Sequence, residues 1–544
     1  MDFTEQLDSA LVIEQQPLAQ SHIKYTLQSL GFKHIDFADR AQLAIQALET
    51  RNYDLVLCAF DLNRGADGYQ LFERILEEKL IGTATTFVFL SSENDMPLSQ
   101  SIIELKPDDF LLKPFNGKEL ELRLKRVLLK KIILKDVFVA IDNQTYKKAI
   151  SALNEHISTN RFPKWIPYLM KLKGEIITYT QNWPLAEAFY EKVSRVQDAP
   201  WAKFGLIESL LHQQKIEPAK AMLKDMLDNP KTKLQALDLM AQICQQDKAF
   251  ELALSHIKQA AELAPRNINR QQQVVELARL THDFELQHNM CASIVRHARY
   301  SIHDCPETYL SAVRAAVDYG LTCLNQDEIN QLAISSENIL QSMRRHFPGI
   351  PLTEQIQVAQ ARILNMKNEP MQAKKLLFEN IDAKGIYYVD DLEDALDKAK
   401  AFHEMGFHAD SQKLFSEIAR VCEQKNPAPV FAEYIRNEQQ LRIDIKQSPK
   451  QLNNQAVGYF SRGNYQGAYE AFTAAFRLMP KNPSIALNLM QTIVEHHHLD
   501  LHDEDVRSQL NACQAVLTEH SLSEEQNTRL AKLNQMLDAK RVPV

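Results

Sequence analysis

The sequence is poor in glycine, which accounts for only 14 of its 544 residues, against a usual share of roughly 7%. The tight turns of an all-β protein depend on glycine, because it adopts left-handed backbone conformations at little cost. The shortage therefore argues against an all-β fold and favours long helices joined by short connections. At about 150 residues per domain, the length predicts three or four domains, or one domain followed by a repeat array.

Long apolar runs, closely spaced cysteines and an excess of basic residues are also missing. No apolar stretch approaches the roughly 20 residues of a membrane helix, and the acidic N-terminus lacks the apolar segment of a secretory signal. None of the seven cysteines forms a Cys-x-x-Cys pair, which argues against zinc-ribbon and thioredoxin-type sites. The sequence has 62 Lys and Arg residues and 70 Asp and Glu residues. Binding to a nucleic-acid backbone requires a basic surface, which this balance does not favour. We therefore expect a cytoplasmic protein that binds neither membranes nor nucleic acid.

Residues 1–131 alternate short apolar runs with helical patterns. The apolar runs that we expect to form strands are 10–13, 35–37, 54–59, 86–90 and 110–112. The stretches with helical periodicity are 17–30, 40–49, 68–79, 98–105 and 118–131. This alternation predicts a doubly wound parallel sheet, whose functional site lies at the carboxyl ends of the strands.

From about residue 143 the strand patterns disappear, and helix, short turn and helix alternate to the C-terminus. The clearest unit places small and aromatic residues at Ala456, Tyr459, Gly463, Tyr465, Ala468, Phe472, Ala475 and Pro480. Alanines permit a close helix crossing, Gly463 permits the turn, and Pro480 ends the second helix. The unit resembles a tetratricopeptide repeat, a helix pair of about 34 residues. Weaker copies precede it, and the segment 285–350 fits a plain helical bundle equally well.

Residues 8–130 resemble the receiver domain of the response-regulator family. The stretches 11–17, 53–68, 89–92 and 107–115 carry the resemblance. The last of them is the most specific, because it ends in Lys113-Pro114-Phe115 after a short fifth strand. The resemblance implies an α/β flavodoxin-like fold with a five-stranded parallel sheet in the order 2-1-3-4-5. Followed by an all-α solenoid, the chain resembles response regulators that carry tetratricopeptide repeats.

The predicted organisation has five sections. They are the receiver domain (1–131), a connecting segment (132–142), tetratricopeptide-like helical repeats (143–300), irregular helical repeats (301–450), and a C-terminal repeat with capping helices (451–544). Stacked helix pairs of this kind present an extended concave surface. We therefore expect the repeats to bind other proteins.

Receiver chemistry, as the resemblance implies it, needs an aspartate at the end of the third strand that takes a phosphoryl group from a kinase histidine. Two acidic residues after the first strand hold Mg²⁺ beside it. Here the acceptor position is Ala59, whose methyl group cannot take a phosphoryl group, and the acidic pair is Glu14-Gln15. Because three carboxylates are reduced to one, we expect weak or absent Mg²⁺ binding and assign no cofactor.

The outer part of the switch keeps the residue types of the family, namely Ser91, Phe110 and Lys113. We expect Lys113 to form an ion pair with Glu14, which would hold the domain in one conformation without phosphate. Asp61 is an alternative phosphoacceptor on the same side of the strand, but it lies about 6.6 Å beyond Ala59.

These features predict a non-enzymatic adaptor of a two-component pathway. Its receiver is expected to bind a sensor histidine kinase or a phosphotransfer domain and to inhibit transfer to the genuine response regulator. One alternative is a phosphorylatable regulator that uses Asp61 and has the repeats as its output. Another is an assembly scaffold, in which the receiver serves as a dimerisation module and the protein forms a homodimer. The sequence contains no Gly-rich phosphate loop, nucleophile triad or His-Glu-x-x-His motif.

Overall fold

The computed structural model describes residues 7–62, 65–92, 96–378, 387–496, 499, 503–520 and 522–541. The outer ends of the first and last predicted sections, residues 1–6 and 542–544, lie outside this set. The chain divides into two compact units. One comprises Met1–Gln271 with Arg296–Asp304, and the other comprises Gln272–Val295 with Cys305–Val544.

The first unit begins with a five-stranded parallel sheet in the predicted order β2-β1-β3-β4-β5. The strands are β1 (Ser9–Ile13), β2 (His34–Ala38), β3 (Leu55–Ala59), β4 (Thr86–Ser91) and β5 (Asp109–Leu112). The helices between and after them are α1 (Pro17–Ser29), α2 (Ala41–Thr50), α3 (Gly68–Glu77), α4 (Met96–Glu104) and α5 (Gly117–Ile133). Every predicted strand and helix of this section is present, with its ends within two residues of the expected positions.

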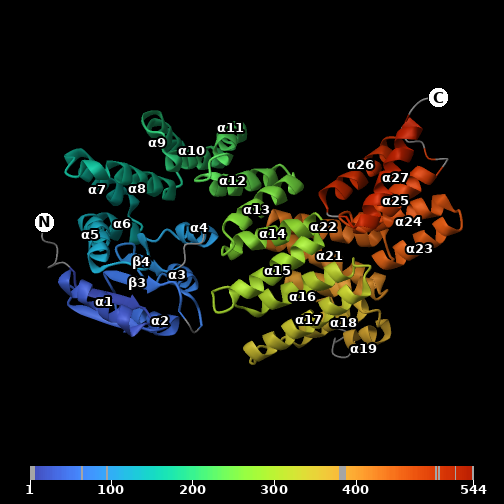
Figure 1. Cartoon of the computed structure of the whole chain (residues 1–544), viewed down its shortest axis with the longest axis horizontal. Coiled ribbons are helices and arrows are strands. Elements are labelled where there is room, and N and C mark those ends of the chain that lie inside the picture. The colour runs from blue at the N-terminus through green and yellow to red at the C-terminus, as the bar shows by residue number, and fades with distance from the viewer. Residues whose placement is uncertain are drawn as a thin grey trace. The chain divides into compact units, whose positions relative to one another are not determined.

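Both faces of this sheet are covered by helices (Figure 1). Leu11 and Val56 lie in the apolar cluster that includes residues of α2, α3 and α4. Their neighbours Val12 and Leu57 point the other way, into the cluster with α1 and α5. All residues of β1, β3 and β4 are therefore buried. Because helices cover both faces of the sheet, the strand sequences are continuous apolar runs rather than alternating apolar and polar residues.

The helices that follow within the first unit begin directly after α5. They are α6 (Lys135–Asp142), α7 (Tyr146–Thr159), a short 3₁₀ helix (Pro163–Trp165), α8 (Ile166–Tyr179), α9 (Trp183–Val196), α10 (Pro200–His212), α11 (Ile216–Leu227), α12 (Lys233–Gln246) and α13 (Phe250–Leu263). The predicted connecting segment 132–142 is largely α6, whose Val137 and Phe138 share an apolar cluster with Leu153 of α7. The segment thus packs as a helix against α7.

The remaining helices run to the C-terminus. They are α14 (Ile268–Leu280), α15 (Phe284–Ala298), α16 (Pro306–Gly320), α17 (Gln326–His346), α18 (Thr353–Met366), α19 (Pro370–Phe378), α20 (Leu392–Glu404), α21 (His408–Lys425), α22 (Pro429–Asp444), α23 (Pro449–Ser461), α24 (Tyr465–Leu478), α25 (Pro483–Glu495), α26 (Glu504–Glu519) and α27 (Glu524–Arg541). Consecutive helices pack in pairs, most extensively α16 with α17, α18 with α19, α20 with α21, and α23 with α24. The all-helical region is therefore built from successive helix pairs.

The pair α23 and α24 carries the residue pattern that the sequence analysis singled out. Ala456 of α23 and Ala468 of α24 are both fully buried in one apolar cluster, together with Phe472. Gly463, in the turn between the helices, has a φ of +75°, in the left-handed region that favours glycine. The small residues therefore lie where two helices pack closely, as the spacing predicted.

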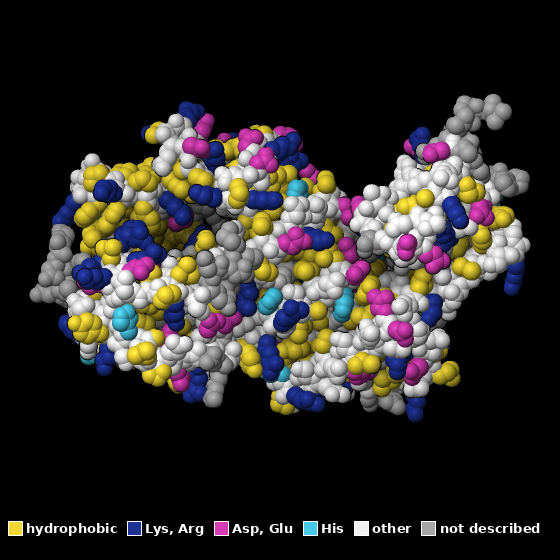
Figure 2. All heavy atoms as spheres, in the orientation of Figure 1, with side chains coloured by type: hydrophobic (Ala, Val, Ile, Leu, Met, Phe, Trp, Pro, Cys, Tyr) yellow, Lys and Arg dark blue, Asp and Glu magenta, His cyan; other side chains and the backbone are white. Residues whose placement is uncertain are grey.

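Two surface properties bear on the expected partners. Within the part of the chain that the structure describes, no helix combines the length and the apolar character needed to cross a membrane. On the face shown in Figure 2, Lys and Arg side chains are interspersed with Asp and Glu rather than gathered in one basic field.

Candidate functional site

The carboxyl ends of the strands bring the predicted switch residues together. The register pairs Ile13 of β1 with Cys58 of β3, so that Glu14 and Ala59 are the next residues on neighbouring strands. The register of β4 with β5 pairs Ser91 with Leu112, the residue before Lys113. Residues that are far apart in the sequence therefore meet at one edge of the sheet, as the doubly wound fold predicts.

Glu14 and Lys113 form the predicted ion pair. Lys113 Nζ donates to Glu14 Oε2 over 2.6 Å, and the backbone N–H of Gln16 donates to the other carboxylate oxygen over 3.0 Å. The Glu14 side chain is only 1% exposed, whereas that of Lys113 is 26% exposed. A carboxylate this deeply buried requires a counter-charge, and Lys113 supplies it.

Ala59 is the last residue of β3 and is fully buried. Helix α3 begins close to it, because a Cβ atom added to Gly68 would lie 2.5 Å from the backbone oxygen of Ala59. Asp67 caps this helix by accepting a hydrogen bond from the N–H of Gln70 over 2.9 Å. The position that the sequence predicts for the phosphoacceptor therefore holds a methyl group close to the start of α3.

Asp61, the alternative acceptor, is exposed and lies beyond the end of β3. Its Oδ2 accepts a hydrogen bond from the hydroxyl of Ser92 over 3.1 Å. Its backbone oxygen accepts a long hydrogen bond of 3.4 Å from the side-chain amide of Gln15. These contacts occupy one carboxylate oxygen and leave Asp61 at the solvent side of the site.

The remaining switch residues lie on β4 and β5. Ser91 is buried at the end of β4, and its backbone oxygen accepts a hydrogen bond from the N–H of Lys113 over 2.7 Å. Phe110 is half-buried and packs against the apolar cluster of α2, α3 and α4. The peptide bond between Lys113 and Pro114 is cis.

The donors at this edge do not fit the Mg²⁺ ion that the fold family implies. Mg²⁺ takes oxygen ligands in near-octahedral geometry, and it is usually held through carboxylates. Glu14 is bound to Lys113, Gln15 contributes a neutral amide, and Ala59 contributes no donor. Among the described residues, no group of three or more His, Cys, Asp or Glu is placed to hold a metal ion. No step of the proposed mechanism is therefore assigned to a metal.

The receiver also contacts later parts of the first unit, through residues that the sequence pattern did not indicate. Arg270 is 4% exposed and is shared by two carboxylates, Glu104 at the end of α4 and Asp238 of α12, with Nε to Oδ1 of Asp238 at 2.8 Å. Arg266 pairs with Asp67, the cap of α3. No local pattern predicts such contacts, since Arg270 and Glu104 are 166 residues apart.

The side chain of Gln70 reaches the same part of the first unit. Its Nε2 donates to the backbone oxygens of His297 and Arg299, over 2.7 and 3.0 Å. Together with the arginine contacts, this hydrogen bonding fixes α3 and α4 of the receiver against segments near residues 266–270 and 297–299.

Comparison with known proteins places the receiver in a family. Residues 10–125 match the family model described as the response regulator receiver domain. The segment is 28% identical over 118 residues to the transcriptional activator protein IrlR of Burkholderia pseudomallei, covering 22% of this chain and 49% of that protein. It is 28% identical over 119 residues to the transcriptional regulatory protein LytR of Staphylococcus aureus, covering 22% of this chain and 46% of that protein. The chain thus spans about half the length of these relatives.

Solved structures give similar matches. A putative response regulator from Chloroflexus aurantiacus is 25% identical, with a TM-score of 0.21, over 23% of this chain and 98% of its own. The receiver domain of the sensor histidine kinase PA1611 from Pseudomonas aeruginosa, which coordinates a magnesium ion, is 24% identical, with a TM-score of 0.21, over 22% of this chain and 98% of its own. The family model over residues 10–125 and the order of the elements show that the chain begins with a response regulator receiver domain, which is followed by a helical region.

Proposed function

We propose that this protein is a non-enzymatic, cytoplasmic adaptor of two-component signalling. Its receiver docks on a sensor histidine kinase or a phosphotransfer domain without taking the phosphoryl group, and it thereby inhibits transfer to the cognate response regulator. The observation that carries the proposal is Ala59 at the carboxyl end of β3, beside the buried ion pair of Glu14 and Lys113. A methyl group has no nucleophilic atom, and the ion pair occupies the one carboxylate left nearby.

The surface of α1 supports docking. Leu18 and Tyr25 are large apolar side chains that are 84% and 76% exposed. They are seven residues apart and so lie on one face of α1, whose first turn closely follows Glu14. Exposed apolar side chains gathered at one place mark interaction sites. We infer that this face contacts the helices that carry the phosphorylated histidine.

Inhibition follows from occupancy. A docked receiver that cannot react covers the histidine for as long as it stays bound. The effect is therefore competitive with the active response regulator and grows with the concentration of this protein. The helix pairs, which we propose to be tetratricopeptide repeats, supply a separate surface for other proteins or for a second copy of the chain.

The experiment measures the transfer of a radiolabelled phosphoryl group from a cognate kinase to its response regulator, with and without the full-length protein in molar excess. We expect slower transfer, relieved by raising the concentration of the regulator. Leu18→Glu with Tyr25→Glu should abolish the slowing. The matched control is Leu252→Glu, on an exposed site of α13 far along the chain, which should leave it intact. No slowing, together with no kinase binding in a pull-down, would reject the proposal in favour of the assembly scaffold.

A second candidate function follows from Asp61, which is exposed and accepts a hydrogen bond from Ser92. If Asp61 takes the phosphoryl group, the chain is a phosphorylatable regulator whose output is the helical region. Incubation with a small phosphodonor and Mg²⁺ separates the two functions. We expect no acyl phosphate on the natural sequence, and partial phosphorylation when Ala59→Asp and Gln15→Asp are combined. An acyl phosphate on the natural sequence that Asp61→Ala removes would establish the alternative.

A further inference from the structure

The second unit contains a cavity of about 330 Å³ that opens to the surface and has an ionic wall. The charged residues of the wall are Arg279, Arg314, Arg362, Lys400, Glu276, Glu307, Asp318, Glu393 and Asp397. All nine belong to the four helices α14, α16, α18 and α20. The volume is at the lower end of the roughly 300–1,000 Å³ that small-molecule sites occupy.

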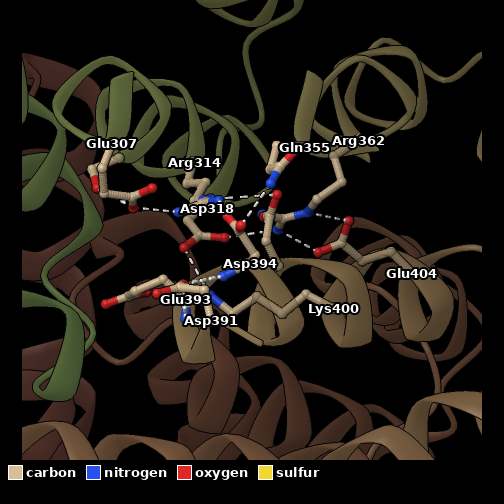
Figure 3. Close-up of polar contacts among 12 residues, drawn as sticks. Glu307, Arg314, Asp318, Gln355, Arg362, Asp391, Glu393, Asp394, Lys400 and Glu404 are labelled. Carbon is tan, nitrogen blue, oxygen red and sulfur yellow. Dashed lines mark hydrogen bonds and ion pairs between the residues drawn. The ribbon is translucent and has the colours of Figure 1, made fainter. Parts of the chain in front are cut away.

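The charges in the wall are arranged as a network of close contacts (Figure 3). Arg362, 1% exposed, donates to Asp397 over 2.6 Å and to Asp318 over 2.7 Å. Lys400 Nζ donates to the other oxygen of Asp318 over 2.8 Å and to the hydroxyl of Tyr434 over 2.6 Å. Apolar side chains of similar volume would usually stabilise such an interior at least as well. Stability alone therefore does not account for an ionic wall around an open cavity.

Some polar atoms of the wall have no hydrogen-bond partner in the part of the chain that the structure describes. They are Gln287 Oε1 and Arg279 Nε. Arg314 Nε, by contrast, lies 3.5 Å from Asp397 Oδ2 and is ion-paired with it. Gln287 is only 4% exposed, so its amide oxygen is withdrawn from water without compensation. The guanidinium of Arg279 stacks on Phe431 and Tyr434, and its Nη1 donates to Glu393 over 3.0 Å. Among the described residues, the acceptor Gln287 Oε1 therefore has no donor, and the donor Arg279 Nε has no acceptor.

The wall also carries one carboxylate more than it has cations. Burial raises the pKa of Glu307 to about 7, and it raises the pKa of Glu276 as well. Both shifts mean that burial makes the ionised forms of Glu307 and Glu276 less favourable than they would be in water. A ligand with an ammonium group would relieve that cost, and one that also has a carboxylate would accept a hydrogen bond from Arg279 Nε.

We propose that this cavity binds a small zwitterion of the α-amino-acid class. The ammonium group donates to Gln287 and to Glu307, and the ligand carboxylate accepts from Arg279 Nε. Basic amino acids match the wall best, because their net positive charge balances its extra carboxylate. The proposal does not depend on kinase docking by the receiver, since every residue of the cavity lies in the second unit.

The test is thermal unfolding and calorimetric titration of the full-length protein with each of the twenty L-amino acids at millimolar concentration. A ligand that binds only the folded state raises the melting temperature as its concentration rises. We expect the largest rise with lysine or arginine. Butylamine supplies the ammonium alone and succinate supplies carboxylates alone, and both should bind more weakly. No rise with any amino acid, or binding of butylamine as tight as that of lysine, would overturn the proposal.

Substitutions at two matched glutamines locate the site. Gln287→Leu should weaken binding about tenfold, which is the loss of roughly one hydrogen bond, while the protein without ligand keeps its stability. Gln271 is a suitable control, because it is 2% exposed and also has an unpartnered Oε1, but it does not line the cavity. Gln271→Leu should leave the affinity unchanged. Glu307→Gln, which keeps the shape but removes the charge, should also weaken binding. Equal affinities of the two glutamine variants would reject this location.

Discussion

Lys113 Nζ lies 2.6 Å from Glu14 Oε2, although the two residues are 99 positions apart in the sequence. The contact joins the end of β1 to the segment after β5, across the carboxyl edge of the sheet. The carboxylate is almost completely buried and the ammonium group is partly exposed. We expect this pair to hold the receiver in one state without a phosphoryl group.

Lys113→Met tests what the pair contributes. The substitution leaves the buried Glu14 carboxylate without its counter-charge, which costs 3–5 kcal/mol in fully buried pairs; we expect about 2 kcal/mol because Lys113 is partly exposed. Glu14→Gln combined with Lys113→Met should recover part of the loss. The free energy of unfolding in urea measures both effects.

The control for that experiment is the exposed pair of Arg74, in the last turn of α3, and Glu78, the residue that follows the helix, with Nε to Oε1 at 2.8 Å. Glu78→Gln should cost no more than about 0.5 kcal/mol. If Lys113→Met costs as little as Glu78→Gln, the pair does not hold the site together.

Gly68→Ala should destabilise the receiver. The added Cβ atom would meet the backbone oxygen of Ala59 at 2.5 Å, and backbone cannot move aside as a flexible side chain can. Overpacking of this kind costs about 1–3 kcal/mol. Gly458→Ala is the control, because nothing lies within 4 Å of its added Cβ and the residue is inside α23. It should stabilise by about 0.5–1 kcal/mol. Equal unfolding free energies for both variants would contradict the close approach of α3 to β3.

Ala468→Trp should disrupt the pair of α23 and α24. Ala468 is fully buried where the two helices pack against each other. Inserting a large side chain there lowers the free energy of unfolding by about 1–3 kcal/mol or more. Circular dichroism on heating should show an earlier or less cooperative loss of helix. Val457→Trp, at a site of α23 that is 45% exposed, should leave melting nearly unchanged. Unchanged melting of Ala468→Trp would show that the crossing is not close.

The stability of the helical region should fall in mild acid because of His403. Burial lowers the pKa of this histidine to about 4, and the charges of Arg442 and His408 act in the same direction. The folded-state pKa is therefore below the value near 6.5 of an unfolded chain. The contribution to stability is complete above about pH 6.5 and is lost as the pH falls toward 4, by up to about 3 kcal/mol.

His403→Gln should make the free energy of unfolding less dependent on pH between 7 and 4. His346→Gln, at an exposed site of α17, serves as the control and should keep the dependence of the natural sequence. Urea unfolding at a series of pH values measures the slopes. Identical slopes for His403→Gln and the natural sequence would mean that His403 does not titrate at low pH.

The receiver fold was predictable because its signals are local. Continuous apolar runs such as 54–59 mark strands covered on both faces, and the periodic stretches between them mark the helices. The spacing of Ala456, Gly463 and Ala468 likewise predicted two helices in close contact, and both alanines are fully buried. The segment 132–142 was harder to interpret, since whether a short helical stretch packs or only connects depends on the neighbour that covers it.

The sequence by itself determined the chemistry that is absent from the receiver. An alanine at position 59 and a glutamine at position 15 remain a methyl group and an amide however the chain folds, and helical or strand periodicity depends only on neighbouring residues. Only the tertiary structure decided which charges meet. Arg270 with Glu104, and Arg362 with Asp318, are brought together by the packing of separate helices. The sequence around a charged residue of a helix does not indicate which distant residue it will contact. Neither these ion pairs nor the ionic cavity could therefore be predicted from the sequence pattern.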